Sequence, residues 1–167
     1  FSGVNDVTFA GHITGNGILQ KAGSGTLVLA KATNYSGGTN VNDGIIAISS
    51  NNALGGGRID FNGDGLKSQD YDVTLANNIE LTSAGKITTD TNLALTGAIT
   101  SSSGKELEKD GTSKLTLSGN NSAYTGDIKV SDGLLSVTDA SNLGGTTGSK
   151  LALDGGDLEV TSESNST

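Results

Sequence analysis

The residue types that carry out acid–base or nucleophilic chemistry are scarce in this sequence. His12 is the only histidine, and the 167 residues include no cysteine. A histidine pair for a metal ion, a Ser/His/Asp triad and a Cys/His dyad therefore cannot be assembled within the chain. We expect His12 to be a surface or corner residue. We assign no catalytic residue, no cofactor and no cofactor-binding residue.

One acidic motif has the spacing of a metal loop. Residues 60–65, Asp-Phe-Asn-Gly-Asp-Gly, fit the opening of a calcium loop, in which alternating carboxylates suit a hard cation. The twelfth position, which requires a bidentate Glu, is Tyr71, and no helix pattern flanks the loop. We favour a turn in which Ile59 and Phe61 point inward and residues 62–65 form a corner. Whether the loop from Asp60 to Asp64 holds calcium stays open here, and no metal ligand is assigned.

A second acidic group suggests glycan cleavage. Enzymes with a β-helix fold use paired carboxylates on one face, and Asp70, Asp72 and Glu80 are candidates for such neighbours. Those enzymes usually place basic or aromatic residues nearby, whereas Arg58 is the only arginine and the chain has three Tyr and three Phe. We therefore favour a solvated acidic surface that keeps the protein soluble.

Composition limits the partners. The net charge is −8 and the ten Lys and Arg residues are scattered singly, so no basic patch exists to bind nucleic acid or anionic lipid. No run approaches the roughly 20 apolar residues of a membrane-spanning helix, so we expect no membrane insertion by this segment. The sequence has 26 Gly, no Pro and 33% hydrophobic residues, which indicates either disorder or turn-rich β structure.

The apolar residues decide for β structure, because they recur in pairs two positions apart. This is the period of a strand with one face inward. Breaks rich in Gly, Asn, Asp and Ser separate the pairs, and no helical period persists over three turns. The pairs are Val7/Phe9, Leu27/Leu29, Thr39/Val41, Ile46/Ile48, Ile59/Phe61, Val73/Leu75, Ile79/Leu81, Leu93/Leu95, Leu115/Leu117, Ile128/Val130, Leu135/Val137, Leu151/Leu153 and Leu158/Val160.

The chain repeats itself at an offset of 88 to 89 residues. Residues 19–29 match residues 107–117, and the match continues from 41–48 to 130–137, so the copies occupy residues 19–56 and 107–145. Such a unit cannot bury its apolar side alone, and stacking of successive turns is the natural way to make a core. We therefore predict an all-β, right-handed parallel β-helix, or solenoid, of about seven turns over residues 1–160. We expect it to be a fragment of a longer stack.

The repeat resembles the autotransporter-associated β-strand repeat of type V secretion. The resemblance is carried by two strings in each copy. These are Leu19-x-Lys21-x-Gly23-x-Gly25-Thr26-Leu27-x-Leu29 with Asn34-Tyr35-x-Gly37-Gly38-Thr39-x-Val41-x-x-Gly44-x-Ile46, and Leu107-x-Lys109-x-Gly111-x-x-Lys114-Leu115-x-Leu117 with Tyr124-x-Gly126-x-Ile128-x-Val130-x-x-Gly133-x-Leu135. The second copy departs from the motif at Ser113, Lys114 and Asp127.

The resemblance implies a passenger segment on the bacterial cell surface or secreted, made from a precursor anchored in the outer membrane. It implies a non-enzymatic stalk with an adhesion or aggregation surface, whose partners are proteins or glycans of host or bacterial cells. A receptor-binding toxin segment and, less favoured, a polysaccharide-cleaving enzyme are the alternatives. We also expect the end turns to favour self-association and residues 161–167 to form a frayed tail.

Overall fold

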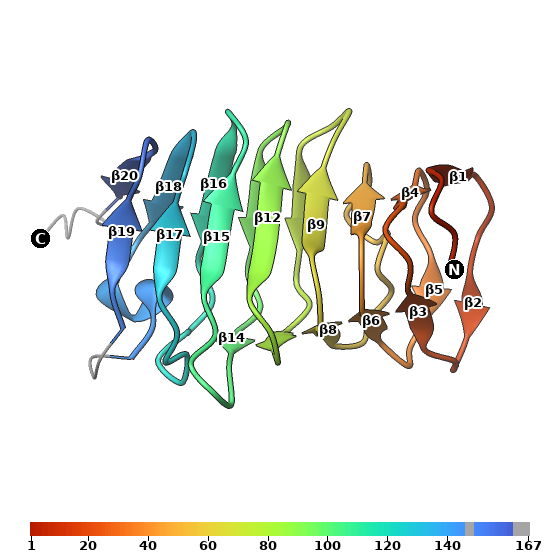
Figure 1. Ribbon diagram of the computed structural model, residues 1–167, viewed down its shortest axis with the longest axis horizontal. Helices are drawn as coiled ribbons and strands as arrows, with labels where there is room; N and C mark the ends of the chain where they lie inside the picture. Colours follow the sequence, from red (N-terminus) through yellow and green to blue (C-terminus); the bar gives the residue numbers. More distant parts are fainter. Residues whose placement is uncertain (146–148, 162–167) are drawn as a thin grey trace, which may run out of the picture.

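The computed structural model describes residues 1–145 and 149–161, which wind into a parallel β-helix (Figure 1). Three parallel sheets run along the rod, and the chain passes from one to another as it winds around the axis. We call the eight-stranded one sheet 1, and each passage around the axis that begins at one of its strands is called a coil. Sheet 1 contains β1 (Val7–Phe9), β4 (Thr26–Leu29), β7 (Ile45–Ile48), β9 (Gly65–Ser68), β12 (Gly85–Thr89), β15 (Leu107–Asp110), β17 (Ile128–Val130) and β19 (Leu151–Leu153).

The other two sheets each have five strands. Sheet 2 contains β10 (Val73–Leu75), β13 (Leu93–Leu95), β16 (Lys114–Leu117), β18 (Leu134–Val137) and β20 (Asp157–Val160). Sheet 3 contains β3 (Leu19–Lys21), β6 (Thr39–Val41), β8 (Ile59–Phe61), β11 (Ile79–Leu81) and β14 (Ile99–Thr100). A short pair, β2 (Thr14–Gly15) with β5 (Asn34–Tyr35), and a 3₁₀ turn, η1 (Ala140–Leu143), complete the elements.

The rod has eight coils, one more than the sequence predicted. Partners in register lie between 19 residues apart, as in Leu27 with Ile46, and 23 apart, as in Ile128 with Leu151. The prediction assumed about 20 to 25 residues for each turn, and the coils fall at the short end of that range. At about 4.8 Å for each strand spacing, eight strands give a rod about 34 Å long.

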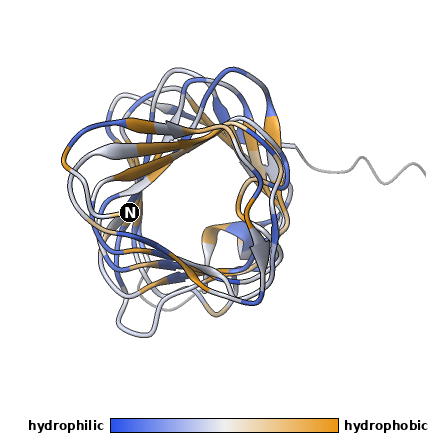
Figure 2. Cartoon of the chain, turned by 90° about the vertical axis from the view of Figure 1, so that its right-hand side faces the viewer, coloured by the Kyte–Doolittle hydropathy of each residue, from blue (hydrophilic) through white to orange (hydrophobic). Residues whose placement is uncertain are grey.

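Seen along its axis, the rod is a ring of superposed coils (Figure 2), and the core consists of columns of buried side chains from successive coils. All thirteen predicted apolar pairs fall in strands of the three sheets. One column of sheet 1 runs Leu27, Ile46, Leu66, Ile87, Lys109, Val130, and one of sheet 2 runs Val73, Leu93, Leu115, Leu135. Aliphatic side chains fill this narrow interior because successive coils place them directly above one another.

Two lysines interrupt the apolar interior at equivalent positions of the two repeats. Lys21 and Lys109 are only 2% and 0% exposed. Nζ of Lys21 donates to the carbonyl oxygens of Gly23 and Asp43, and Nζ of Lys109 donates to those of Asp110, Gly111 and Asp132. The ammonium groups are therefore satisfied by backbone carbonyls at a corner of the rod, and the lysine of the repeat is a structural residue.

Buried asparagines join the coils on the opposite side of the core. The side chain of Asn121 accepts a hydrogen bond from the backbone N–H of Ile99 and donates one to the carbonyl oxygen of Asn142, at 2.7 and 2.6 Å. Asn142 in turn donates to the carbonyl oxygen of Gly119. These bonds span three consecutive coils, and they satisfy backbone groups where sheet 3 has no strand.

The two repeats occupy different faces of the rod. The first repeat begins with β3 and β4, in sheets 3 and 1, whereas the second begins with β15 and β16, in sheets 1 and 2. Later elements shift in the same way: β6 and β7 lie in sheets 3 and 1, and β17 and β18 lie in sheets 1 and 2. The offset of 88 to 89 residues is therefore four coils plus one face.

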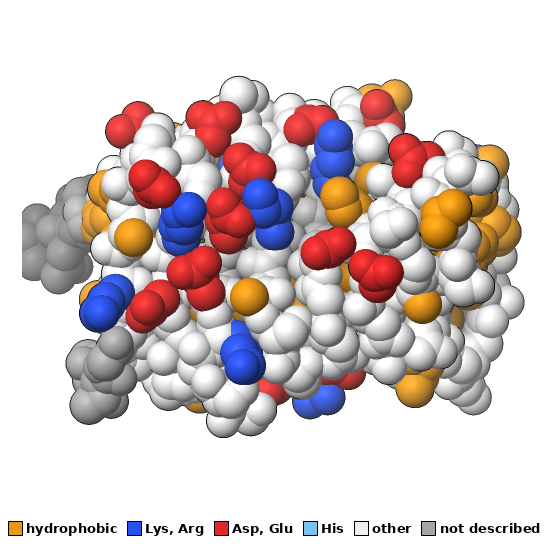
Figure 3. All heavy atoms as spheres, in the orientation of Figure 1, with side chains coloured by type: hydrophobic (Ala, Val, Ile, Leu, Met, Phe, Trp, Pro, Cys, Tyr) orange, Lys and Arg blue, Asp and Glu red, His pale blue; other side chains and the backbone are white. Residues whose placement is uncertain are grey.

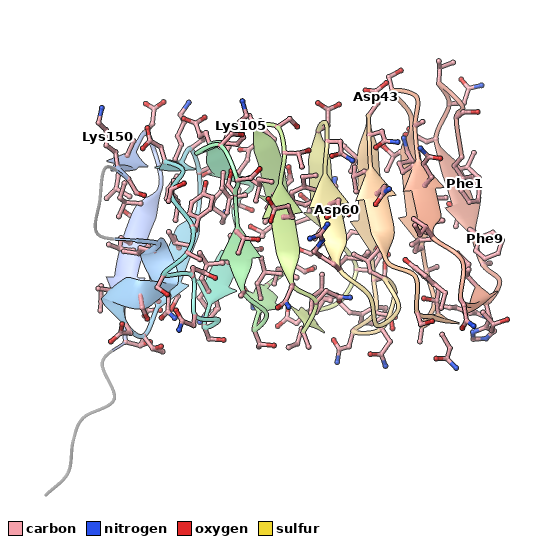
Figure 4. All side chains as sticks on the ribbon, turned by 90° about the horizontal axis from the view of Figure 1, so that it is seen from below. Phe1, Phe9, Asp43, Asp60, Lys105 and Lys150 are labelled. Carbon is pink, nitrogen blue, oxygen red and sulfur yellow. The ribbon has the colours of Figure 1, made fainter. Side chains whose placement is uncertain are left out.

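Both ends of the rod expose apolar side chains. At the N-terminal end the rings of Phe1 and Phe9 pack edge to face with centroids 6.2 Å apart (Figure 4), and Val4 is 74% exposed. At the other end Leu153 is 52% exposed and Val160 is 60% exposed. The described residues contain no helix with the length and apolar character needed to cross a membrane. Most of the predicted frayed tail, residues 162–167, lies outside the described residues.

Candidate functional site

His12 lies on the surface near the N-terminal end of the rod. Its side chain is exposed, and Nδ1 is 2.8 Å from the carbonyl oxygen of Ala32 on the next coil. The position agrees with the predicted surface or corner residue. Within residues 1–145 and 149–161, no three His, Asp or Glu side chains gather closely enough to hold a metal ion.

The loop from Asp60 to Asp64 connects β8 to β9 at a corner of the rod. The Asp60 carboxylate pairs with the guanidinium of Arg58 at 2.6 Å, on the outer side of sheet 3. The Asp64 carboxylate accepts a hydrogen bond from the backbone N–H of Gly44 on the preceding coil. The side chain of Asn62 bonds to that of Asn42, also on the preceding coil. The carboxylates thus serve different contacts, which supports the turn interpretation.

Of the three carboxylates weighed for glycan cleavage, Asp70 and Asp72 lie in the connection from β9 to β10, and Glu80 lies on another face of the rod. Asp70 accepts hydrogen bonds from Ser49 and Gln69 in the connection that leads to sheet 2. Asp72 accepts two bonds from Asn92 at the margin of sheet 2. Glu80 is in β11, on the outer side of sheet 3, and accepts a bond from the backbone N–H of Ser102. The structure does not bring the three together.

Charged side chains form a ladder on the outer face of sheet 1 (Figure 3). Lys67 pairs with Asp90, and Lys86 pairs with both Glu108 and Asp110. The ladder continues through Lys129, which pairs with Glu108 at 4.0 Å and with Asp154 at 3.1 Å. Lys86, Glu108 and Lys129 occupy the same outward position of three consecutive coils, so opposite charges alternate there along the rod.

The pKa values of the ladder reflect these contacts. The pKa of Glu108 is lowered first by a hydrogen bond from the hydroxyl of Ser131 and then by Lys86. The pKa of Asp110 is lowered first by the backbone N–H of Gly111. Burial alone would lower the pKa of Lys86, but its bonds to Glu108 and Asp110 raise it. The contacts therefore favour the charged forms of Lys86, Glu108 and Asp110.

A shallow groove runs along the side of the rod that carries sheet 2, and we call it the polar groove. It consists of three adjoining depressions of about 420, 230 and 340 Å³. They share lining residues: the first two share Asn52 and residues 55–56, and the last two share Asn51 and Thr74. The lining residues are 33–34, 51–52, 55–56, 72–74, 76–77, 92–94, 114 and 116.

The groove exists because short residues occupy the outward positions there. In coil 3 the segment 50–57 contains no strand, and Gly55 and Gly56 leave space beside it. In coils 4 and 5 the outward residues at the centres of β10 and β13 are Thr74 and Ala94. The polar margin is held in place by bonds between coils, since Asn51 accepts from the backbone N–H of Thr74.

The groove is not predicted by the sequence. Its polar residues lie 20 to 23 positions apart, as in the bonds of Asp72 to Asn92, Asn92 to Lys114 and Asn51 to Thr74. That spacing is the length of one coil. Short polar residues that recur at this spacing are the sequence pattern that could have predicted the groove. The 88-residue repeat has a different period, because it spans four coils and one face.

Comparison with known proteins finds two matches to one repeat family and one similar protein. Residues 19–48 and 107–137 match the family described as Passenger-associated-transport-repeat. The chain is 39% identical over 137 residues to the Adhesin BmaC autotransporter of Brucella suis biovar 1 (strain 1330), an alignment that covers 81% of this chain and 4% of that protein. The chain therefore spans a small fraction of that relative's length. No solved structure matches the chain.

Proposed function

Because the chain is an autotransporter passenger segment that carries two passenger-associated transport repeats, we propose that it is a rigid, non-enzymatic stalk with an adhesive outer surface. An autotransporter passenger is found at the bacterial cell surface or secreted, from a precursor anchored in the outer membrane, and this location holds for the segment. The relative is named an adhesin. An adhesive role of this chain itself is the proposal.

One observation carries the stalk role: sheet 1 pairs eight strands in register without interruption along the rod. Each coil is bonded to the next by backbone ladders, and the inner columns stack at the same spacing. A coil can bend away from its neighbour only by breaking several hydrogen bonds and exposing core side chains at once. This supports a stiff spacer that holds its outer faces at a fixed distance from the cell.

The non-enzymatic part of the proposal rests on the placement of the acidic residues. Asp70, Asp72 and Glu80 bond to different partners, and Glu80 lies on a different sheet from the others. A glycosidase needs two carboxyl groups about 5 to 10 Å apart that flank one bond of the substrate. Glu80 cannot pair with the other two across one substrate bond, because it lies on sheet 3, and Asp70 and Asp72 are each bonded to polar side chains of the rod. Soluble sugars released from neutral or acidic glycans by the purified segment would contradict the proposal.

The stalk is tested by small-angle X-ray scattering on the purified chain. We expect a scattering curve that matches the one calculated from the eight-coil β-helix, and an expanded chain or a curve that the β-helix does not fit would overturn the stalk role. Adhesion is tested separately by displaying the segment on a non-adherent bacterium and counting cells that attach to epithelial layers. Attachment no greater than that of the undisplayed strain would overturn the adhesive role. Saturable binding to a single host receptor, followed by its uptake, would instead favour the toxin alternative.

A further inference from the structure

The polar groove crosses five consecutive coils, from coil 2 with Asn34 to coil 6 with Lys114. At the spacing of parallel strands its length is about 19 Å. It is shallow, and its shared lining residues make one continuous path parallel to the rod axis. A ligand that fits it is long and narrow, and it presents similar polar groups at each step.

The lining offers hydrogen-bonding groups that the fold does not use. Among the residues that the structure describes, no intramolecular hydrogen bond involves the hydroxyls of Thr74 and Thr116 or the side-chain amide of Asn34. The Nδ2 donor of Asn51 is likewise open, since only its oxygen is bonded, to the backbone N–H of Thr74. Amides and hydroxyls both donate and accept, and they therefore match ligand hydroxyls. Thr74 and Thr116 lie in strands of sheet 2, Asn34 lies in β5, and Asn51 is bonded to the backbone of Thr74, so little ordering is needed on binding.

An exposed aromatic residue is the neighbour in sequence of one lining residue. Tyr71 directly precedes Asp72 of the groove and is 70% exposed. The other large hydrophobic side chains that are exposed in residues 1–145 and 149–161 lie in the first coil or the last, at the open ends of the rod. The residue before Tyr71, Asp70, has a φ of 66° and is held by a bond from Ser49. Neither burial nor an end of the stack explains an exposed ring in the middle of the rod.

From these features we propose that the polar groove binds a neutral, linear oligosaccharide that lies along the rod axis. A sugar ring has a hydroxyl edge that bonds to amides and hydroxyls, and an apolar face that packs on an aromatic ring. One ring is about as long as the rise from coil to coil, so successive sugars meet equivalent outward positions. The net charge of −8 disfavours a sulfated or uronic-acid polymer. The groove also lacks the deep apolar pockets that anchor protein side chains.

This inference rests on the adhesive role proposed above and adds the chemistry of the ligand. It is tested by isothermal titration of the purified chain with three neutral hexasaccharides: a β-1,4-linked N-acetylglucosamine hexamer, maltohexaose and cellohexaose. We expect at least one to bind with millimolar or tighter affinity. Ala94→Arg places a long side chain across the groove and should weaken that binding at least tenfold. Gln20→Arg, at an exposed outward position of sheet 3, is the matched control and should leave it unchanged.

Tyr71 is the site of a second variant, and because its side chain is exposed, replacing it should not destabilise the fold. Tyr71→Ala should weaken binding roughly tenfold, while Tyr71→Phe, which keeps the ring, should stay within about threefold of the original chain. Failure of all three sugars to bind, or binding that Ala94→Arg leaves intact, would overturn the proposal. Binding of heparin fragments or of an unfolded protein that Ala94→Arg abolishes would overturn it too, because the groove would then serve another class of partner. Direct titration needs no cell attachment, so this result stands apart from the adhesion test.

Discussion

Lys109 and Asp132 lie on successive coils, and Nζ of Lys109 donates a hydrogen bond of 2.9 Å to the carbonyl oxygen of Asp132. Lys21 and Asp43 make the equivalent contact in the first repeat at 3.0 Å. In both repeats a glycine with positive φ, Gly44 or Gly133, follows the aspartate, and its N–H bonds to the aspartate carboxylate. The repeat motif therefore encodes a corner that locks one coil to the next.

The first prediction concerns this lysine corner. Lys109→Met should destabilise the chain by about 2 to 3 kcal/mol, because three buried carbonyl oxygens lose a charged donor. Lys21→Met should cost less, since its Nζ serves two carbonyls. The free energy of unfolding in urea measures both. Lys31→Met, at an exposed position, is the control. Equal stability of Lys109→Met and the original chain would refute the structural role.

The second prediction concerns the glycine of the corner. Gly133 has a φ of 65°, and a Cβ there would lie 2.4 Å from the carbonyl oxygen of Gly111. Gly133→Ala should therefore cost about 2 kcal/mol or more, from the left-handed conformation and the close contact together. A Cβ at Gly17 would meet no atom within 4 Å, so Gly17→Ala should be neutral. Thermal unfolding compares the two, and a similar melting temperature for both variants would contradict the argument.

The third prediction concerns the buried amide that joins three coils. Asn121 is 2% exposed and satisfies one N–H and one carbonyl group of the backbone. Asn121→Ala leaves both groups buried and unpaired, and we expect a loss of about 2 to 4 kcal/mol. Asn5→Ala, at an exposed site, should stay within about 0.5 kcal/mol of the original chain. Hydrogen exchange should also show that the amide of Ile99 loses protection in Asn121→Ala alone.

The fourth prediction concerns acid. The pKa values of Glu108 and Asp110 are lower in the folded chain than their ordinary values. Below about pH 4 the unfolded chain takes up protons at these groups more readily than the folded chain does. Their contribution to stability is thus present above the unfolded pKa values and is lost as the pH falls through the folded ones. The double variant Glu108→Gln, Asp110→Asn should show a shallower loss of stability between pH 5 and 3, and a decline as steep as that of the original chain would count against it.

The sequence predicted the class of fold because its apolar residues alternate wherever both inward positions of a strand are apolar. Except for β6 with Thr39, it missed strands in which one inward position is polar, as in β3 with Lys21, β9 with Ser68 and β15 with Lys109. A lysine in a strand is usually read as an outward residue, and only the stacked coils show which carbonyl oxygens surround it. In these strands the residues two positions apart do point inward, but one of the two has a polar or charged side chain.

The groove was beyond reach of the sequence for a different reason. It depends on Thr74 and Ala94 lying side by side, which requires the register between β10 and β13. That register places Thr74 opposite Ala94 only once the coil length is known, and the coil length varies from 19 to 23 residues along the rod. The same lack of register left open whether Asp72 and Glu80 are neighbours, and the structure places them on different faces.

The shift of one face between the two repeats affects how a longer rod would present itself to its surroundings. A further copy at the same spacing would point one third of a circle away from the second, and the copy after that would return to the azimuth of the first. Residues that belong to the repeat would then follow a helical path around the rod. A longer rod built in this way would present the same repeat features to a neighbouring cell at any rotation about its own axis.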